Sequence, residues 1–556
     1  MKNKLLKRLT AGLILSSLLV STVGCGTKEE GDNGAVPAGT ATGSSQEVAA
    51  APAADDDTLN IAVGIDFNTV DTIIAYGTEI DILVNSVTEG LFYYDENSEV
   101  QPFLVSSYTQ PDDTTYVYEI REDVVFSDGT PLDAEDVAFS LNRHLDPDNA
   151  SQLGWMFDKV ESIEQTGDYE VTVKLSEPDA SWQYTLATPA GNVISKDYYE
   201  THKDGYGTSE GGFIGSGPYV ITSWDTAEID LEYNEDYWNK AETEVGFKKL
   251  KFLSITDQSV VKAALESGQI DFTQALSLDA AKELQAKDVV NIQATDYLGS
   301  TFISFNTTVD KLADKKVRQA IAYAVDKETI LNDIIGSDYA SIGKSQLFSS
   351  SIANAYPDIW GDYFDKENAY SYDPEKAKEL LAEAGYPDGF DIQLKYVASD
   401  STSEDVSLYI QQNLADVGIN VTLEGIDSSE YSTIRYGGSE TREYELFLTY
   451  WGSDYPDPIG TITPMYYSTN NVAGGSNWAE YKNKDFDKLI DEQNVATTPE
   501  ERIPILKDAL DILEEDIPYA PVYNHYKVFA TSKRVDYQFS TMLLYNIYTK
   551  NIKKAK

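Results

Sequence analysis

Two aspartates, Asp454 and Asp457, lie among aromatic residues and prolines in the stretch YWGSDYPDP, which runs from Tyr450 to Pro458. The stretch contains no Lys, Arg or His, so its own residues supply no cation. A carboxylate surrounded by aromatic rings loses water, which costs free energy unless a cation binds it. The pair could therefore bind a cationic ligand group, or act as the acid and nucleophile of a glycosidase. For Asp457, which precedes a proline, the alternative is a cap on a turn.

Histidine and cysteine form no recognised catalytic or metal-binding constellation. The three histidines are far apart in the sequence, and no HExxH motif or Cys/His cluster typical of a zinc site is present. They are His144, His202 and His525. We expect each of them to be structural or exposed, and we predict no metal site and no cofactor.

Two short segments resemble catalytic motifs but lack the context that those motifs need. GTSEG at 207–211 matches the GxSxG esterase motif, which requires a strand before it and a helix after it, whereas its flanks here indicate loops. IGKS at 342–345 ends like a phosphate-binding loop, but Asp338 stands where the first glycine is required. We therefore predict that the chain is not an enzyme.

The elements that must position Asp454 alternate between strands and helices. Leu446-Phe447-Leu448 predicts a buried strand, so Asp454 lies where a strand leads into a turn. Further strands are predicted from alternating apolar residues at 58–64, 116–126, 169–178 and 419–426. Amphipathic helices are predicted at 131–145, with Asp133 as N-cap, 314–331, 372–385, with Asp373 as N-cap, 405–417 and 501–515. This mixture is typical of layered α/β folds.

Composition restricts the class of protein. A chain of 556 residues predicts two or three domains, and an apolar fraction of 42% is that of a globular protein. The formal net charge is −51, which repels phosphate backbones, so nucleic acid is not expected as a partner. With one cysteine, Cys25, no disulfide can form within the chain.

The N-terminal residues predict secretion. Four basic residues precede a short apolar run from Leu9 to Val20, which is shorter than the ~20 residues that a membrane span needs. We predict a signal peptide at 1–24. Thr22-Val23-Gly24-Cys25 resembles a bacterial lipobox, which implies a lipidated Cys25; the alternative is an ordinary secretory signal with an incidental cysteine. Residues 25–57 are poor in large apolar residues and predict a disordered tether.

Five segments occur in one order along the chain: SDGTPLDAEDVAFSLNR (127–143), GSGPYVITSW (215–224), ALESGQIDF (264–272), VRQAIAYAVDKETI (317–330) and AEAGYPDGF (382–390). Together they resemble the extracellular solute-binding proteins of ABC importers, in the peptide/nickel-binding family. The resemblance covers essentially all of residues 58–550. It implies an α/β fold of two lobes around a cleft, with an extra β-rich subdomain in lobe I and two crossings between the lobes.

The resemblance also implies domain boundaries. Lobe I would comprise 58–98, a β-rich subdomain at 99–210, 211–300 and a C-terminal return at 522–556. Lobe II with its hinges would comprise 301–521. The crossings would lie near Ser300–Asn306 and Ala520–His525.

In peptide-binding members of the family, an aspartate in a Trp-x-x-Asp-Tyr setting holds the ligand's α-ammonium. Trp451-Gly452-Ser453-Asp454-Tyr455 matches that setting, so the resemblance assigns this role to Asp454; the alternative is a carboxylate that caps a turn or pairs with an arginine. The strand end at Tyr450, Trp451 and Gly452 would offer backbone groups to a peptide. In lobe I, Tyr76, Gly77 and Thr78 would face the ligand's other edge, or form a plain glycine turn. Arg435 and Arg442 could each reach a ligand carboxylate, and neither is preferred.

The resemblance implies a lipid-anchored receptor, outside the cytoplasm and most consistent with a Gram-positive envelope. It would bind oligopeptides as a monomer and deliver them to a membrane permease with cytoplasmic ATPases. One alternative is the same fold with another solute, such as an oligosaccharide, a nickel chelate or haem. A more distant alternative is an acid hydrolase using Asp454 and Asp457.

Overall fold

The computed structural model describes residues 56–556 except for 96–97, 348, 350–351, 353–355, 366–369, 497 and 539–545. The described residues belong to one compact unit. Cys25, the signal peptide and most of the predicted tether lie outside the described residues. Within the described part of the chain, no helix is long and apolar enough to cross a membrane.

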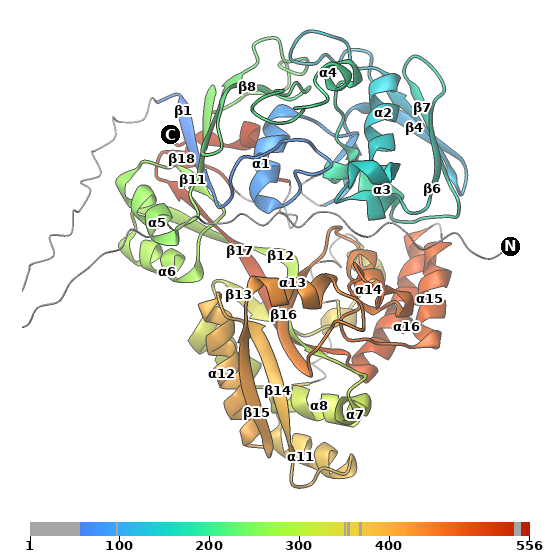
Figure 1. The fold of residues 1–556 in the computed structure, drawn as a ribbon, viewed down its shortest axis with the longest axis vertical. Helices are drawn as coiled ribbons and strands as arrows, with labels where there is room; N and C mark the ends of the chain where they lie inside the picture. The colour runs from blue at the N-terminus through green and yellow to red at the C-terminus, as the bar shows by residue number, and fades with distance from the viewer. Residues whose placement is uncertain are drawn as a thin grey trace, which may run out of the picture. The chain divides into compact units, whose positions relative to one another are not determined.

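One large sheet runs through the described unit (Figure 1). Its strands, in spatial order, are β15 (Ile419–Ile426), β14 (Phe390–Val397), β16 (Leu446–Gly452), β12 (Val290–Phe305), β17 (Tyr519–Ser532), β11 (Phe272–Thr273), β1 (Thr58–Val63), β10 (Lys249–Ser254), β9 (Glu228–Tyr233) and β8 (Tyr219–Trp224), with β13 (Ala340–Ile342) paired to β17. A separate four-stranded sheet has the order β4 (Val105–Asp112), β5 (Thr115–Ile120), β7 (Glu170–Leu175) and β6 (Val160–Gln165). Short pairs join β2 (Phe92–Tyr94) to β3 (Val100–Pro102) and β18 (Val535–Asp536) to β19 (Lys553–Lys554).

The helices divide into two groups along the chain. Those before β12 are α1 (Thr78–Val87), α2 (Ala134–Leu145), α3 (Trp182–Leu186), α4 (Lys196–Thr201), α5 (Gln258–Ser267) and α6 (Leu278–Lys287). Those after it are α7 (Asp310–Ala313), α8 (Lys315–Ala324), α9 (Lys327–Thr329), α10 (Pro357–Trp360), α11 (Pro374–Glu383), α12 (Ser401–Ala415), α13 (Ser428–Tyr436), α14 (Ile459–Tyr466), α15 (Lys484–Asn494) and α16 (Pro499–Asp516).

The long strands β12 and β17 connect two halves of this unit. They pair with each other in antiparallel fashion from Val290↔Ser532 to Ser304↔Tyr519. In Figure 1, β1, β8 and α1 lie above this pair, in the half that corresponds to predicted lobe I, and β14, β15 and β16 lie below it, in the half that corresponds to lobe II. The stretch 520–525, predicted as one crossing, lies inside β17, and the stretch 300–306, predicted as the other, covers the end of β12 and the residue after it. We keep the names lobe I and lobe II for these halves.

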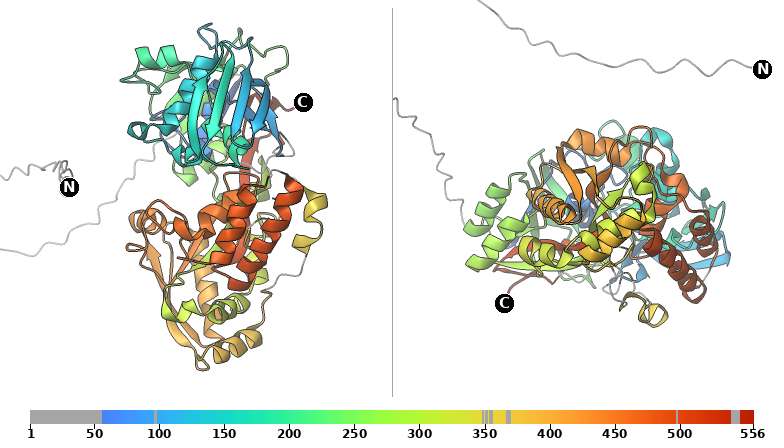
Figure 2. Two further views of the ribbon diagram at one scale, coloured as in Figure 1. Left: turned by 90° about the vertical axis from the view of Figure 1, so that its right-hand side faces the viewer. Right: turned by 90° about the horizontal axis from the view of Figure 1, so that it is seen from below.

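The four-stranded sheet β4–β7 is the structural form of the predicted β-rich stretch, and Figure 2 shows it beside the rest of lobe I. A buried ion pair ties this region to the N-terminal part of the chain, because both Nη atoms of Arg143 on α2 donate to the two carboxylate oxygens of Asp71, at 2.9 and 2.6 Å. The hydrophobic core beneath this sheet is continuous with side chains of lobe II, among them Tyr455, Trp478 and Leu510. The two lobes are therefore in direct apolar contact.

Several predicted element boundaries are confirmed by capping contacts. The Asp133 side chain accepts hydrogen bonds from the backbone N–H groups of Glu135 and Asp136, and the Asp133 N–H donates to the Asp136 side chain, which forms a capping box. Asp373 caps α11, and Gly418, with φ of +90°, ends the α12 segment before β15.

Two predictions of element length were too long. The strand predicted at 116–126 ends at Ile120, where the backbone N–H of Arg121 donates to the Leu104 carbonyl outside the β5 ladder. The helix predicted at 314–331 breaks at Val325, because the Asp326 side chain accepts from the Thr329 N–H and starts a new helical segment.

Candidate functional site

Asp454 lies at the end of β16, as the sequence predicts. The strand ends at Gly452, and the backbone N–H of Ser453 then donates to the Leu298 carbonyl at 2.7 Å. The Ser453 hydroxyl donates to the Tyr455 carbonyl at 2.8 Å, which closes a turn around Asp454. The turn leaves the Asp454 side chain half-buried.

One partner of Asp454 comes from lobe I. The Tyr76 hydroxyl donates to Asp454 Oδ1 at 2.6 Å, across 378 residues of sequence. Burial raises the pKa of Asp454, while the Tyr76 hydrogen bond and the charge of Arg435 act in the opposite direction. Burial, followed by the negative charge of Asp454, raises the pKa of Tyr76 well above its ordinary value. The hydroxyl therefore stays protonated and acts as the donor.

Helix α1 begins directly after Tyr76 and Gly77. Gly77 is the N-cap residue and has no side chain that could cap the helix. Its φ of +141° is a backbone conformation that favours glycine. The Thr78 carbonyl accepts a hydrogen bond from the Gln274 side chain. Tyr76, Gly77 and Thr78 are thus brought to the same place as Asp454, although the sequence separates them widely.

The strand end at Tyr450 to Gly452 has one unpaired edge within the described residues. On one side, β12 pairs with β16 as far as Gly299↔Gly452. On the other side, β14 pairs with β16 only at Leu446 and Phe447. The segment from Thr449 to Gly452 thus extends beyond β14. Gly452 lies close to the Tyr297 side chain, because a Cβ at position 452 would be 3.1 Å from the Tyr297 ring.

A cationic group surrounded by aromatic rings lies beside this edge. Arg435 is in the last turn of α13, and its guanidinium lies over the rings of Trp478 (4.8 Å) and Tyr450 (5.4 Å). Its Nη1 donates to the Tyr431 hydroxyl at 2.7 Å, and its buried Nε makes no hydrogen bond. The indole Nε1 of Trp451 is also buried without an acceptor. No carboxylate of the described residues forms a salt bridge with Arg435.

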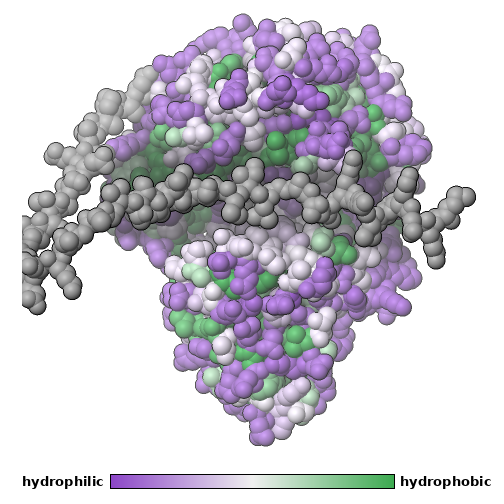
Figure 3. All heavy atoms as spheres, in the orientation of Figure 1, coloured by the Kyte–Doolittle hydropathy of each residue, from purple (hydrophilic) through white to green (hydrophobic). Residues whose placement is uncertain are grey.

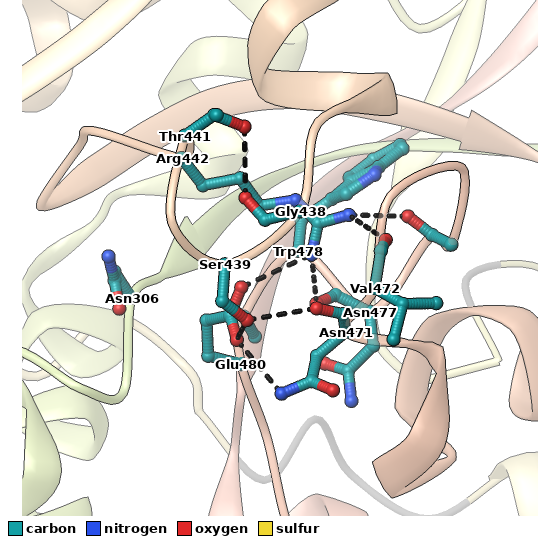
Figure 4. A network of polar contacts seen from close by, with 12 residues as sticks. Asn306, Gly438, Ser439, Thr441, Arg442, Asn471, Val472, Asn477, Trp478 and Glu480 are labelled. Atoms are coloured by element: carbon teal, nitrogen blue, oxygen red, sulfur yellow. Dashed lines mark hydrogen bonds and ion pairs between the residues drawn. The ribbon is translucent and has the colours of Figure 1, made fainter. Parts of the chain in front are cut away.

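Arg442 has a different environment and is structural (Figure 4). Its side chain is fully buried, and its Nη1 donates to Glu480 Oε1 at 3.2 Å and to the Asn477 carbonyl at 3.0 Å. Further bonds go to the carbonyls of Ile434, Val472 and Gly475. Glu480 in turn accepts from Ser439 and Asn471. This network fixes the loop that places Trp478 beneath Arg435, and it leaves Arg442 unable to reach a ligand.

Tyr455 forms part of an aromatic wall on the other side of Asp454. Its ring lies 6.2 Å from Trp155 and 6.5 Å from Tyr184, both in the β-rich region, and its hydroxyl is 3.5 Å from Thr185 Oγ1. In Figure 3, hydrophobic residues are visible on the upper half, lobe I, close to its lower edge. The arrangement suits a ligand with charged groups and apolar side chains.

Asp457 is a structural residue. Its Oδ1 accepts from the Ile459 N–H at 2.9 Å, which confirms the turn cap. Both oxygens also accept from Arg502, at 2.6 and 2.5 Å, and the residue is buried. A carboxylate held in this way is not available as a nucleophile beside Asp454, so the geometry does not support the hydrolase alternative.

The histidines occupy separate places. Burial lowers the pKa of His144 to about 3 and that of His525 to about 4, so both are neutral near pH 7. His202 is exposed and stacks on Tyr198. His525 lies near the site, with its Nε2 2.5 Å from Thr301 Oγ1 and its ring 6.1 Å from that of Tyr450. Among the described residues, no group of three or more His, Cys, Asp or Glu is arranged to hold a metal ion.

Sequence reasoning did not single out Asp81 on α1, a buried acid on which the charge of Asp454 acts. Its signal was a lone acid within the apolar run Ile80-Asp81-Ile82-Leu83-Val84, all of which is buried. An acid on an otherwise apolar helix segment is uncommon and requires a partner or a function.

Comparison with known proteins identifies the kind of protein that has this architecture. A family model described as bacterial extracellular solute-binding proteins, family 5 (middle region), matches residues 99–473. The glutathione-binding protein GsiB of Escherichia coli (strain K12) is 28% identical over 482 residues, covering 85% of this chain and 90% of that protein.

Two solved structures have the same fold. The substrate-binding protein CtaP of Listeria monocytogenes has a TM-score of 0.78 and 24% identity, covering 90% of this chain and 100% of the other. The periplasmic binding protein DppA of Helicobacter pylori, in complex with the peptide STSA, has a TM-score of 0.73 and 24% identity, covering 90% and 98%. These likenesses confirm the predicted two-lobed α/β fold.

Proposed function

Because the chain belongs to the bacterial extracellular solute-binding proteins of family 5, we propose that it captures oligopeptides for an ABC importer. The peptide binds between the lobes and is delivered to a membrane permease driven by cytoplasmic ATPases. The chain itself catalyses no reaction.

The observation that carries this proposal is the placement of Asp454 and Arg435 beside one open strand edge. A peptide has an ammonium group at one end, a carboxylate at the other and a backbone that forms hydrogen bonds between them. Asp454 provides the negative charge, and Arg435 provides a guanidinium that forms no salt bridge with a carboxylate of the described residues. The strand edge from Thr449 to Gly452 lies between Arg435 and Asp454 in the sequence.

The ammonium contact is the specific part of the proposal. Two unit charges about 4 Å apart interact by ~4 kcal/mol at an effective dielectric constant of 20. Tyr76 donates to Oδ1 of Asp454 at 2.6 Å and so helps to orient the carboxylate. Trp451 and Tyr455 exclude water on either side, which strengthens the electrostatic interaction.

Backbone pairing supplies affinity that does not depend on side chains. An extended peptide adds as a strand to an exposed sheet edge, and each hydrogen bond contributes ~0.5–1.5 kcal/mol. Tyr450 and Gly452 of this edge, with Gly77 and Thr78 of lobe I, are the proposed backbone contacts. Arg435 and the Trp451 Nε1 are the proposed donors to the carboxylate.

The relatives support a peptide as the ligand class. GsiB is named for binding glutathione, which is a tripeptide, and DppA was solved with the peptide STSA. Peptides bind the closed arrangement best, because only then do both lobes contact them, and this differential affinity drives closure.

The location of the protein follows from its leader. We infer that Cys25 is lipidated and that the body is held outside the cytoplasmic membrane by residues 25–57, in a Gram-positive envelope and as a monomer. Metabolic labelling with a fatty acid analogue, comparing the wild type with Cys25→Ser, tests the anchor.

Thermal unfolding tests the ligand class. After removal of co-purified ligand, a mixture of free-amine oligopeptides should raise the midpoint, since a ligand at 100 times its Kd stabilises the fold by ~2.7 kcal/mol. Oligosaccharides, nickel–histidine chelates and haem should leave the midpoint unchanged. A shift with one of these solutes and none with peptides would contradict the proposal.

A further inference from the structure

Asp81 is a buried carboxylate without a hydrogen-bonding partner. It lies in the first turn of α1 and is 1% exposed. Neither of its carboxylate oxygens makes a hydrogen bond. A buried anion is costly unless it is paired, so this side chain requires either a cationic partner or protonation.

Asp81 follows Tyr76 by five residues, and the Tyr76 hydroxyl is bonded to Asp454. The negative charges of Asp81 and Asp454 act on each other, and the charge of Asp81 also acts on the Tyr76 hydroxyl that lies between the two segments. Asp81 belongs to lobe I and Asp454 to lobe II. Two acids from different lobes thus act on the same Tyr76 hydroxyl.

Among the described residues, no cation forms a salt bridge with Asp81. The charged groups that act on it are Glu79 and Asp454, both negative, and only the Gly77 backbone opposes them. Burial is the largest cause that raises its pKa well above the usual range. The positive charge of Lys527 acts on Glu79 and forms no salt bridge with Asp81.

We propose that Asp81 is a second ligand-binding carboxylate, and that the primary ammonium of the ligand is held between Asp81 and Asp454. This inference rests on the proposed function. A primary ammonium has three N–H donors and can reach Asp81, Asp454 and the Tyr76 hydroxyl together. A metal ion is a poorer occupant, because the described acids, histidines and cysteines form no group of three around this place.

This contact links ligand chemistry to lobe closure. Without a ligand, closing the lobes brings two carboxylates together, which is unfavourable. An ammonium between them converts this repulsion into attraction, so the ligand binds the closed arrangement preferentially. The substrate class is thereby restricted to peptides with an unblocked primary amine. Peptides with an acylated or dialkylated N-terminus lack the donors to contact both carboxylates.

Calorimetric titration of the purified chain with trialanine tests the inference. We expect Asp81→Asn to weaken trialanine binding at least tenfold and to leave the weak binding of N-acetyl-trialanine unchanged. Asp279→Asn, an exposed acid in the first turn of α6, is the matched control and should bind like the wild type.

The outcomes separate this inference from the proposed function. If Asp81→Asn binds trialanine within twofold of the wild type while Asp454→Asn loses binding, the proposed function stands and the role of Asp81 is wrong. If the wild type binds no peptide, the proposed function fails. If Asp81→Asn does not fold, the affinity of the wild type for N,N-dimethyl-trialanine, which keeps the charge but has one N–H donor, is measured instead. An affinity tenfold lower than that for trialanine supports binding by two carboxylates. Equal affinity for the two ligands overturns the inference.

Discussion

The Tyr76 hydroxyl donates a 2.6 Å hydrogen bond to Asp454 Oδ1 and thereby joins the start of α1 to the end of β16. In the described structure this is a direct polar contact between the lobes at the proposed ligand site. It helps to hold the acid in place.

Removing this hydroxyl should weaken the closed arrangement. We expect Tyr76→Phe to lower the free energy of unfolding of the ligand-free protein by about 1.5 kcal/mol, since a hydrogen bond to a charged acceptor contributes ~1.5–3 kcal/mol. Urea denaturation provides the measurement. Tyr436→Phe, which removes the hydroxyl of an exposed tyrosine, should have no effect. Equal stability of the two variants would show that the contact is not maintained in solution.

The Asp457–Arg502 ion pair should be a major structural contact. Arg502→Met leaves Asp457 buried without its partner, and we expect a loss of ~3–5 kcal/mol in unfolding free energy. The double variant with Asp457→Asn should lose less than the sum of the single changes. Glu492→Gln, which breaks an exposed pair with Lys488, should stay within ~0.5 kcal/mol of the wild type. A small effect of Arg502→Met would mean that the pair is solvated.

Glu514 should make stability depend on pH. Burial raises its pKa from 4.5 to about 7, with the Gln346 N–H, the Ser345 side chain and the charge of Lys327 opposing. Because the folded pKa exceeds the unfolded one, the contribution to stability is fully present below about pH 4.5 and is lost as pH rises through 7.

Comparing Glu514→Gln with the wild type isolates that contribution. The difference in unfolding free energy between variant and wild type should shift in favour of the variant as the pH rises from 4.5 to 8. Denaturation at several pH values measures it, and a difference that does not change with pH would contradict the raised pKa.

Arg435 should recognise the C-terminal carboxylate of the peptide. We expect Arg435→Gln to weaken binding of trialanine about tenfold. For trialanine amide, which lacks the carboxylate, the variant and the wild type should bind with nearly the same affinity. Titration of both ligands against both proteins gives the coupling between side chain and carboxylate. Lys488→Gln, at an exposed cation, serves as the control. An equal loss for both ligands would show that Arg435 supports the fold of α13 and not the ligand.

The sequence predicts local features of this protein well because their causes are local. The caps at Asp133 and Asp373 depend on neighbouring backbone groups, and the position of Asp454 follows from the apolar strand before it. The helix break at Asp326 was missed because its side chain competes with a periodic apolar pattern that continues across it.

Contacts between distant segments could not be predicted from the sequence. Arg435 and Arg442 are equivalent in sequence terms, and only packing shows that Arg442 is bonded to Glu480 and Arg435 is not. The bond between Tyr76 and Asp454 depends on how the two lobes are placed against each other. That geometry arises from the summed packing of many residues.

The central claim is that Asp454 binds the free ammonium of a peptide, and a four-way titration tests it most directly. The Kd of trialanine and of N-acetyl-trialanine is measured for the wild type and for Asp454→Asn after removal of co-purified ligand. We predict that the wild type binds the free amine about 100-fold more tightly than the acetylated peptide. This preference should disappear in Asp454→Asn, because the variant lacks the carboxylate that pairs with the ammonium. A preference that is the same in both proteins would contradict the claim.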